Sequence, residues 1–430
     1  MLTMPPASDH ADTARLGTLL DLTVVPTVAG REGRVIEWVR RWTEQRENVV
    51  LTTDAAGNLV LQPRVPFVPR KGSTVAPLYI TAHLDHPAFV VERVLGPTTV
   101  EVAFRGGVMD PYFERARVRA HTAAGATIGA TLTGETGGAG RAGAGGGGAG
   151  GGQPMFKTYA AELDTGAAAD ALRPGDVVTW ELPAAEVDAE GVVHTHACDD
   201  LAAAAAALDA FDRLLALSAA GEGLEDVRLL FTRAEEIGFV GAIAACRLGT
   251  IARGARVIAL ENSRFSAEAP IGGGPIVRVG DRMSVFTPSL TNACAKRAEQ
   301  ASARPAQPLA TQTRAGAESA AKFRWQRKLM SGGACEATVF CASGYDATCI
   351  CLPLGNYHNM SHLDLVQEGK WDAAASGPPR VAREFIGASD YAGLVELLTA
   401  IGRELPEADN IMPRIESLYA TRGFVLNERP

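Results

Sequence analysis

Apolar residues recur along the chain with two different periods, one typical of helices and one typical of strands. The helical period marks two segments near the N-terminus, residues 13–23 and 31–48. Short apolar runs bounded by glycine or proline then predict strands at residues 49–54, 57–63 and 76–85. This mixture predicts that the chain opens with the first part of an α/β sheet.

The same alternation returns in the second half of the chain. An alanine-rich helix is expected at residues 200–220, followed by a strand at 227–231, a helix at 236–249 and a strand at 255–262. A β-α-β order with short connections is typical of a sheet whose parallel strands are joined by helices. We therefore predict an α/β fold, with a mixed, mostly parallel sheet flanked by helices, built from both halves.

The segment between these halves has a different character. Residues 90–197 contain strand-like runs separated by turn residues and little helical pattern, which predicts a small inserted domain resembling a β-barrel. The catalytic domain would then comprise residues 1–89 and 198–430. Within the insert, residues 137–152 are glycine and alanine except for Arg141, so we expect a disordered loop without a catalytic role.

Composition and charge narrow the class of protein. The 430 residues carry 49 acidic and 41 basic side chains, a net charge of -8, which argues against a nucleic-acid-binding surface. No apolar run reaches the length of a membrane span, and the first residues lack the order of a signal peptide. Seven cysteines without a CxxC pair suit a reduced protein, so we expect a cytoplasmic location without membrane or nucleic-acid partners.

Candidate chemistry gathers where the expected strands end. Functional groups of open α/β sheets lie just beyond the carboxyl ends of the strands. The side chains found at such ends are His83, Asp85, Asp199, Asp200, Glu235, Glu236, Glu261 and His358. A single histidine there is usually structural, and an Asp pair before a helix is often only a cap. The combination of two histidines with several carboxylates favours a metal site instead.

The adjacent Glu235 and Glu236 indicate a site for two metal ions with a general base beside them. Imidazole and carboxylate are ligands for Zn²⁺ and Co²⁺, and two ions about 3.5–4 Å apart need one bridging carboxylate and further ligands for each. Two like charges after a buried strand repel each other, and a bound cation offsets that repulsion. One glutamate can therefore bind metal while the other acts as general base towards a water.

Several motifs occur in a specific order along nearly the whole chain. They include "AHLDH", "CDDLA", "RAEEIGFVGA", "GGPIVRVGDRMS" and "LPLGNYHNMSH". This ordered set resembles the glutamyl aminopeptidase/endoglucanase-like family of dinuclear metallopeptidases, which includes the tetrahedral aminopeptidases and has the zinc-aminopeptidase fold. The resemblance implies a peptide substrate and two divalent ions per chain, Zn or Co with Mn as an alternative. It also implies self-association into a dimer or larger homo-oligomer through the inserted domain.

The resemblance also implies roles for individual residues. The metal ligands would be His83, Asp199, Glu236, Glu261 and His358. Asp199 would bridge the two ions, and the Asp199–Asp200 peptide bond would be cis. Glu235 would be the general base that later protonates the leaving amine, and Asp85 would orient His83.

The chain departs from the family pattern at a few positions. Glu261 stands where the aminopeptidases have Asp, and Glu at that position resembles related carboxypeptidases and deacylases. Leu201 replaces an Arg, His86 an acidic residue, and Cys335–Glu336 a Thr-Asp pair. Three functions stay open: an aminopeptidase acting on short peptides, a carboxypeptidase or N-acyl-amino-acid deacylase on the same metals, and a non-catalytic scaffold.

Overall fold

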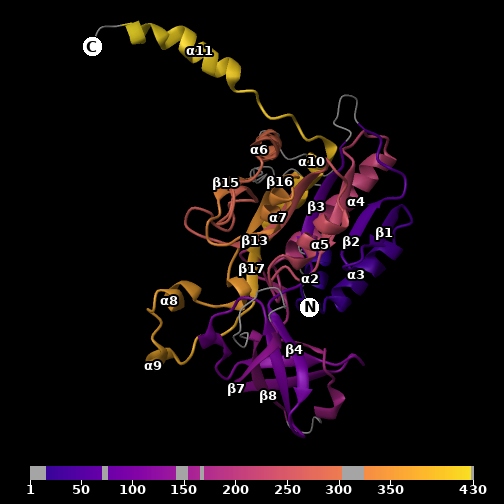
Figure 1. Cartoon of the computed structure of the whole chain (residues 1–430), viewed down its shortest axis with the longest axis vertical. Coiled ribbons are helices and arrows are strands. Elements are labelled where there is room, and N and C mark those ends of the chain that lie inside the picture. The colour runs from indigo at the N-terminus through magenta and orange to yellow at the C-terminus, as the bar shows by residue number, and fades with distance from the viewer. Residues whose placement is uncertain (1–15, 70–75, 142–153, 165–168, 303–323, 428–430) are drawn as a thin grey trace, which may run out of the picture.

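The computed structural model describes residues 16–69, 76–141, 154–164, 169–302 and 324–427. An α/β body occupies the middle of the molecule, a β-barrel lies at one end and a helical arm leaves the other (Figure 1). The chain enters the barrel after the third strand of the body and returns to the body afterwards. The functional site can therefore draw residues from both parts.

The body is built on one eight-stranded sheet. In sheet order its strands are β1 (Val49–Thr53), β2 (Leu59–Pro63), β12 (Val227–Thr232), β3 (Leu78–His83), β13 (Arg256–Arg264), β16 (Asp346–Leu354), β14 (Ile276–Gly280) and β15 (Gln326–Leu329). The four central strands β12, β3, β13 and β16 run parallel, and β1, β2 and β14 add antiparallel pairings outside them. This confirms the predicted mixed sheet.

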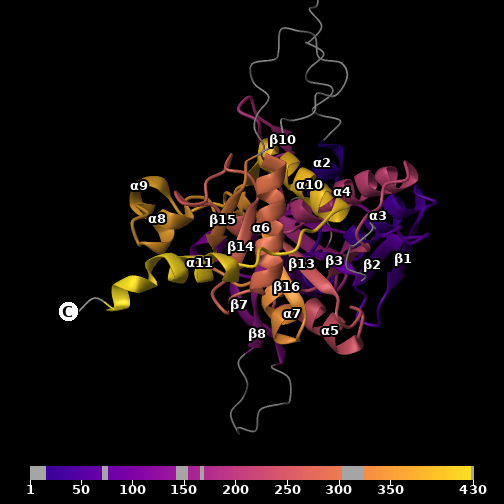
Figure 2. The same ribbon diagram turned by 90° about the horizontal axis from the view of Figure 1, so that it is seen from above.

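Helices cover both faces of the sheet, as Figure 2 shows from above. The larger core forms against α2 (Gly17–Leu22), α3 (Gly33–Glu44), α4 (Leu201–Ala219), α6 (Pro288–Ser302) and α10 (Ala388–Arg403). The opposite face packs against α5 (Val240–Leu248) and α7 (Glu336–Ala342). Strand β3 is buried along its whole length, with Ile80 facing the first core and Tyr79 the second. Its apolar run is therefore continuous instead of alternating.

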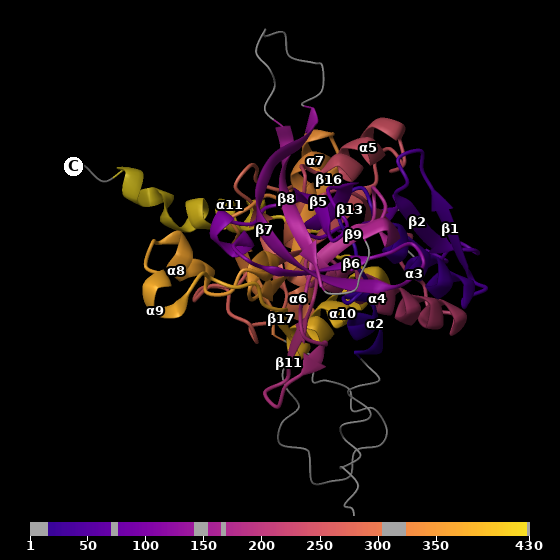
Figure 3. The same cartoon turned by 90° about the horizontal axis from the view of Figure 1, so that it is seen from below.

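The barrel closes from six strands (Figure 3). Their closing order is β4 (Ala88–Val94), β5 (Thr99–Arg105), β8 (Pro154–Leu163), β7 (Thr127–Arg141), β6 (Arg117–His121) and β9 (Val177–Trp180). Aromatic rings fill it: Phe89 and Trp180 meet edge to face at 4.8 Å, and Phe113 stacks on Tyr159 at 4.6 Å. Such pairs stabilise a small core beyond the area that they bury.

The barrel is shorter than the expected insertion of residues 90–197. It begins at Ala88 and ends at Trp180. The next strands, β10 (Glu186–Val187) and β11 (Val192–Thr195), form a separate three-stranded sheet with β17 (Glu384–Gly387). An alternating apolar pattern predicts a strand but not its partner, which is why β11 was expected in the barrel.

The glycine-rich segment 137–152 also needs a correction. Its first five residues continue β7 to Arg141, where Gly137 pairs with Thr158 and Gly138 with Lys157 of β8. Backbone hydrogen bonds to a neighbouring strand need no side chains, so a glycine run can extend a strand that is already paired. The remaining residues, from 142 onwards, lie outside the described residues.

The remaining elements are short or lie near the C-terminus. They are η1 (Asp110–Phe113), η2 (Ala169–Ala171), η3 (Tyr357–Asn359), α8 (Leu363–Gln367), α9 (Ala373–Ser376), α11 (Met412–Arg422) and η4 (Gly423–Asn427).

Helix α5 begins four residues later than expected, because Gly238 and Phe239 both have positive φ angles. Of the expected helix at 13–23, residues 13–15 lie outside the described part. Among the described helices, none is both long and apolar enough to cross a membrane.

Candidate metal centre

The candidate residues meet at the carboxyl edge of the central strands, although they come from five places in the sequence. His83 is the last residue of β3, and Glu235 and Glu236 follow the end of β12. Glu261 lies inside β13, which continues to Arg264, so it does not end its strand as expected. His358 lies in η3, after β16. Parallel neighbouring strands bring these segments to one edge.

Asp199 lies between two histidines. Its Oδ1 is 3.3 Å from His83 Nε2 and its Oδ2 is 3.5 Å from His358 Nε2. Glu261 Oε1 lies 4.0 Å from His83 Nε2, and Glu236 Oε1 lies 3.3 Å from His358 Nε2. Asp199 therefore belongs to two groups of possible metal ligands. One group contains His83, Asp199 and Glu261, and the other contains Asp199, Glu236 and His358. Within each group, the atoms that could bind metal all lie within 4.8 Å of one another. The Asp199–Asp200 peptide bond is cis, as the resemblance implied.

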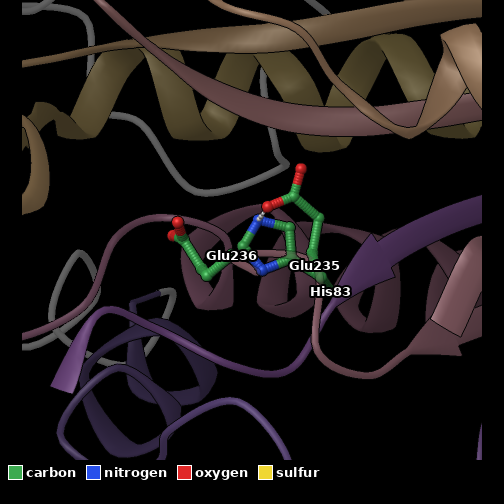
Figure 4. Close-up of side chains that lie close together, drawn as sticks. All are labelled: His83, Glu235 and Glu236. Atoms are coloured by element: carbon green, nitrogen blue, oxygen red, sulfur yellow. Dashed lines mark ion pairs between the residues drawn. The ribbon is translucent and has the colours of Figure 1, made fainter. Parts of the chain in front are cut away.

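The two adjacent glutamates point to different places. Figure 4 shows the Glu235 carboxylate beside the His83 ring, with Oε2 3.9 Å from Nε2, and the Glu236 carboxylate on the other side of the ring. Possible ligand atoms of His83, Glu235 and Glu236 also lie within 4.8 Å of one another, so these three residues could hold a metal ion as well. We assign Glu236 to the group with His358 because its Oε1 lies 3.3 Å from His358 Nε2, within ion-pair distance, whereas its carboxylate forms no such pair with His83 in the described structure. Glu235 is then left next to both ligand groups.

Each histidine is oriented by a hydrogen bond from its other ring nitrogen. His83 Nδ1 lies 3.1 Å from the carbonyl oxygen of Asp85, and His358 Nδ1 lies 2.6 Å from that of Gly107 in the barrel loop. A carbonyl only accepts, so Nδ1 carries a proton in both rings and Nε2 is the nitrogen that faces the carboxylates. This tautomer is the one that metal-binding histidines use.

The donor atoms fit divalent cations. Asp199 Oδ1, Glu236 Oε1 and Asp200 Oδ1 are buried and have no hydrogen-bond partner, although buried polar atoms are normally paired. Oxygen atoms of this kind and two Nε2 lone pairs form a typical ligand set for Zn²⁺ or a similar ion. The residues present therefore fit two metal ions that share one carboxylate.

Burial and mutual repulsion shift the pKa values of these groups. Burial, together with nearby Glu236, raises the pKa of Glu235 well above its ordinary value, and burial with Asp199 does the same for Glu261. Burial opposes the charge of Asp199, but the His358 and His83 rings beside it hold its pKa below the usual range. Asp199 is thus the carboxylate that stays ionised most readily in this crowded cluster.

The Asp85 carboxylate holds the turn that carries the two glutamates. It accepts the backbone N–H of Glu235 at 2.9 Å and that of Glu236 at 3.0 Å. The carboxylate is 3.7 Å from His83 Nδ1, which meets the backbone oxygen of Asp85 at a shorter distance. The contact expected with His83 is therefore made mainly by the backbone of Asp85. Its side chain positions Glu235 and Glu236, and burial raises its pKa to about 6.

A second buried carboxylate supports the same turn from the other side. Glu32 accepts the N–H of Ala234 at 3.0 Å and forms an ion pair with Arg233 at 2.7 Å. Ala234 has a φ of 53°, an unusual conformation for a residue with a side chain. Held by Glu32 before it and Asp85 after it, the turn has little freedom to move the glutamates.

Glu384 is a residue of the site that the sequence did not reveal. It lies on β17 with no exposed surface, and its carboxylate accepts three backbone N–H groups. Those of Cys198 and Asp199 lie at 2.6 and 3.0 Å from Oε2, and that of His358 lies at 2.8 Å from Oε1. One side chain therefore fixes the backbone of the shared carboxylate and of a histidine ligand. It follows His358 by 26 residues, so no local motif marks it.

Residues at the departures from the family pattern surround this centre. His86 lies 2.6 Å from the carbonyl oxygen of Asp199 through Nδ1 and 2.9 Å from Asn359 Oδ1 through Nε2. Glu336 is buried near His83, its Oε1 has no partner, and burial raises its pKa to about 7. Leu201 is fully buried at the start of α4. Of the changed positions, His86 and Glu336 therefore lie beside the metal centre.

A family model decides the classification of the chain. The model for M42 glutamyl aminopeptidase matches residues 67–368, well over half of the sequence. The chain belongs to the M42 glutamyl aminopeptidase family. Membership makes it a metal-dependent aminopeptidase, a peptide hydrolase. A sequence comparison with curated proteins gave no match.

Solved structures of M42 and other aminopeptidases share the fold. An aminopeptidase from the archaeon Desulfurococcus kamchatkensis is 17% identical, with a TM-score of 0.66 over 93% of this chain and 96% of its own. The TET1 peptidase of Pyrococcus horikoshii is 18% identical, with a TM-score of 0.63 over 91% and 99%. An M18-family aminopeptidase from Thermotoga maritima is 12% identical, with a TM-score of 0.59 over 93% and 98%. At these identities the likeness concerns the fold.

Proposed function

We propose that this M42 chain removes N-terminal residues from short peptides with two divalent metal ions. The observation that carries the proposal is the position of Asp199, whose two oxygens each face a different histidine. We assign His83, Asp199 and Glu261 to one ion and Asp199, Glu236 and His358 to the other. In support of this assignment, the possible ligand atoms of each set lie within 4.8 Å of one another. Zn and Co suit these ligands, with Mn as an alternative.

Glu235 is the general base of this proposal. Two bound divalent ions supply Lewis acidity for the attacking water and the peptide carbonyl. Glu235 adjoins both ligand groups, takes the proton from that water and returns it to the leaving amine. Asp85 keeps Glu235 in place through its backbone N–H.

We also propose self-association and a cytoplasmic location. The P. horikoshii TET1 peptidase assembles into a tetrahedron or an octahedral shell, and a related TET1 structure is a dodecamer. The likeness of fold supports a homo-oligomer here. All seven cysteines are free, which supports a reducing compartment.

Glu261 favours a second candidate, a carboxypeptidase or N-acyl-amino-acid deacylase on the same metals. Mass spectrometry of an unblocked mixed-sequence peptide, incubated with the zinc- or cobalt-loaded protein, separates the candidates. Loss of residues from the amino end is the expected result. Loss from the carboxyl end, or hydrolysis only of an N-acylated amino acid, would establish the second candidate instead.

The substitution Glu235→Gln tests whether the chain is a catalyst or a scaffold. We expect the rate of peptide hydrolysis to fall by about 10²–10⁴-fold, because the amide cannot accept the proton of the water. Metal content, measured by plasma emission spectrometry, should remain two ions per chain. Glu268→Gln, on the loop after β13, is the control and should keep the wild-type rate. A scaffold would show no hydrolysis in either protein.

A further inference from the structure

The C-terminal arm, residues 411–427, exposes an apolar face that no other described part of the chain covers. From Asn410 to Leu426 every residue except the half-buried Gly423 is exposed. Helix α11 has no buried residue, and among the described residues the hydrogen bonds of the arm stay within it, apart from the Met412 N–H that bonds Oδ1 of the preceding Asn410. Figures 1 and 3 show α11 standing away from the body.

Large apolar side chains recur along the arm, and those of α11 form an apolar stripe. The large apolar side chains that are 42–73% exposed are Ile411, Met412, Ile415, Leu418, Tyr419, Phe424, Val425 and Leu426. Ile411, Ile415 and Leu418 follow the spacing i, i+4, i+7, which places them on one face of a helix. Eight such side chains, each exposing about half of roughly 200 Å², give an apolar surface on the order of 800 Å², the size of one side of a stable protein interface.

The beginning of the arm is anchored to the body. Lys296 on α6 forms an ion pair with Asp409 at 2.5 Å and donates to the carbonyl of Glu407 at 3.2 Å. Arg297, also on α6, pairs with Glu404 at 3.0 Å. The direction in which the arm leaves is therefore set by α6. The arm therefore carries its apolar side chains away from the body and not across its surface (Figure 1).

The body carries a matching apolar patch at one edge of the sheet. Val285, Met283 and Leu329 are 74%, 62% and 56% exposed. Leu329 and Val285 pair with Gly280 from its two sides, and a Cβ placed on Gly280 would lie 3.1 Å from Val285 Cα and 3.2 Å from Leu329 Cδ1. Leu329 belongs to β15, which ends the order of strands. We call Met283, Val285 and Leu329 the edge patch. Each chain thus has one apolar arm and one apolar patch.

We propose that the arm of one copy docks on the edge patch of a second copy of this chain. This rests on the proposed self-association and adds a second contact to the one that the resemblance implies through the inserted domain. A contact between two different surfaces is heterologous, so it can repeat from copy to copy and close into a ring or shell. Charge favours a protein over an anionic membrane as the occupant. Arg414 and Arg422 are the only basic residues in 411–427, and Glu404, Glu407 and Asp409 precede them.

The first experiment measures the mass of the full-length protein by size exclusion with light scattering. We expect the wild-type protein to be an oligomer and Ile415→Asp/Leu418→Asp to form a smaller species. The matched control is Ser417→Asp/Ala420→Asp, which adds the same charge to the opposite face of α11 and should keep the wild-type mass. An Ile415→Asp/Leu418→Asp protein of wild-type mass overturns the proposal, and so does a wild-type protein of single-copy mass.

The second experiment tests the edge patch by complementation. Val285→Asp should reduce the mass as the arm variant does. A mixture of Val285→Asp with Ile415→Asp/Leu418→Asp has one intact arm and one intact patch, so the two should form a mixed dimer. Failure to associate overturns the assignment of the patch. Hydrolysis of a short peptide by each protein is measured in parallel. A wild-type protein without activity would contradict the proposed function, whereas a change of mass in the variants concerns assembly alone.

Discussion

At the scale of single residues, the metal centre depends on backbone groups that are held by buried carboxylates. Asp85, Glu32 and Glu384 together accept N–H groups from the segments that carry Glu235, Asp199 and His358. A carboxylate that accepts several N–H groups in the interior is a strong and specific contact. The ligands are therefore positioned before any metal binds.

The substitution Glu384→Gln tests this arrangement. We expect metal affinity to fall by about 10–100-fold, because the amide offers one acceptor where three N–H groups need two. Calorimetric titration of the metal-free protein with Zn²⁺ measures the change. Glu186→Gln is the control, since Glu186 is an exposed partner of Arg383 on strand β10 of the same small sheet. Equal affinities in the two variants would contradict the positioning role.

The proposed ligands and Asp85 could be found from the sequence, whereas the supporting carboxylates Glu32 and Glu384 could not. His83 and the Glu235–Glu236 pair interrupt apolar runs, so their chemistry stands out along the chain. Glu384 lies in the segment "REFIG", which resembles any short exposed strand. Its role arises from the pairing of β17 with β11, a contact between segments almost 200 residues apart. Local pattern carries no information on such a pairing.

At the scale of elements, helix α5 packs closely against the turn that carries Glu235 and Glu236. A Cβ on Gly241 would lie 2.3 Å from the carbonyl oxygen and 2.4 Å from the nitrogen of Arg233. Asn58 bridges the same place, bonding the N–H of Arg233 and the carbonyl of Gly241. Only glycine allows α5 to begin this close to the turn.

Gly241→Ala should therefore disturb both stability and activity. We expect a loss of about 1–3 kcal/mol in the free energy of unfolding, because backbone atoms must move to admit the methyl group. Peptide hydrolysis should fall as well, since the turn carries Glu235. Gly33→Ala in α3 is the matched control, because a Cβ there meets nothing within 4 Å, and alanine should be neutral or stabilising. Urea unfolding and initial rates provide both comparisons.

The type of each element was easier to predict than its ends. The buried strand before Glu235 and the alanine-rich helix α4 follow directly from their apolar patterns. The start of α5 is set by the left-handed conformation of Phe239, a bulky residue for which this conformation is uncommon. Strand β7 runs into the glycine tract because β8 pairs with it. Both boundaries depend on tertiary contacts.

At the scale of the whole molecule, bound metal should contribute to stability as well as to catalysis. The centre joins carboxylates from β12, β13 and the start of α4 with a histidine next to the barrel, so cations there link separate parts of the fold. Removing metal with a chelator at pH 7 should lower the melting temperature by several degrees, since a ligand at about 100 times its Kd adds about 2.7 kcal/mol. Differential scanning calorimetry measures the shift. The double variant His83→Ala/His358→Ala should not respond to the chelator, and an equal response would place the stabilising metal elsewhere.

The wide separation of the site residues in sequence has a consequence for protein synthesis. The centre needs His83, the barrel carbonyl of Gly107, Asp199 and finally Glu384, which lies in the last strand of the chain. A ribosome makes these segments in that order, so a chain that has not yet emerged beyond β17 lacks the group that fixes Asp199 and His358. An emerging chain should therefore bind metal weakly, and hydrolyse the free amino ends of its neighbours slowly, until β17 has paired with β11.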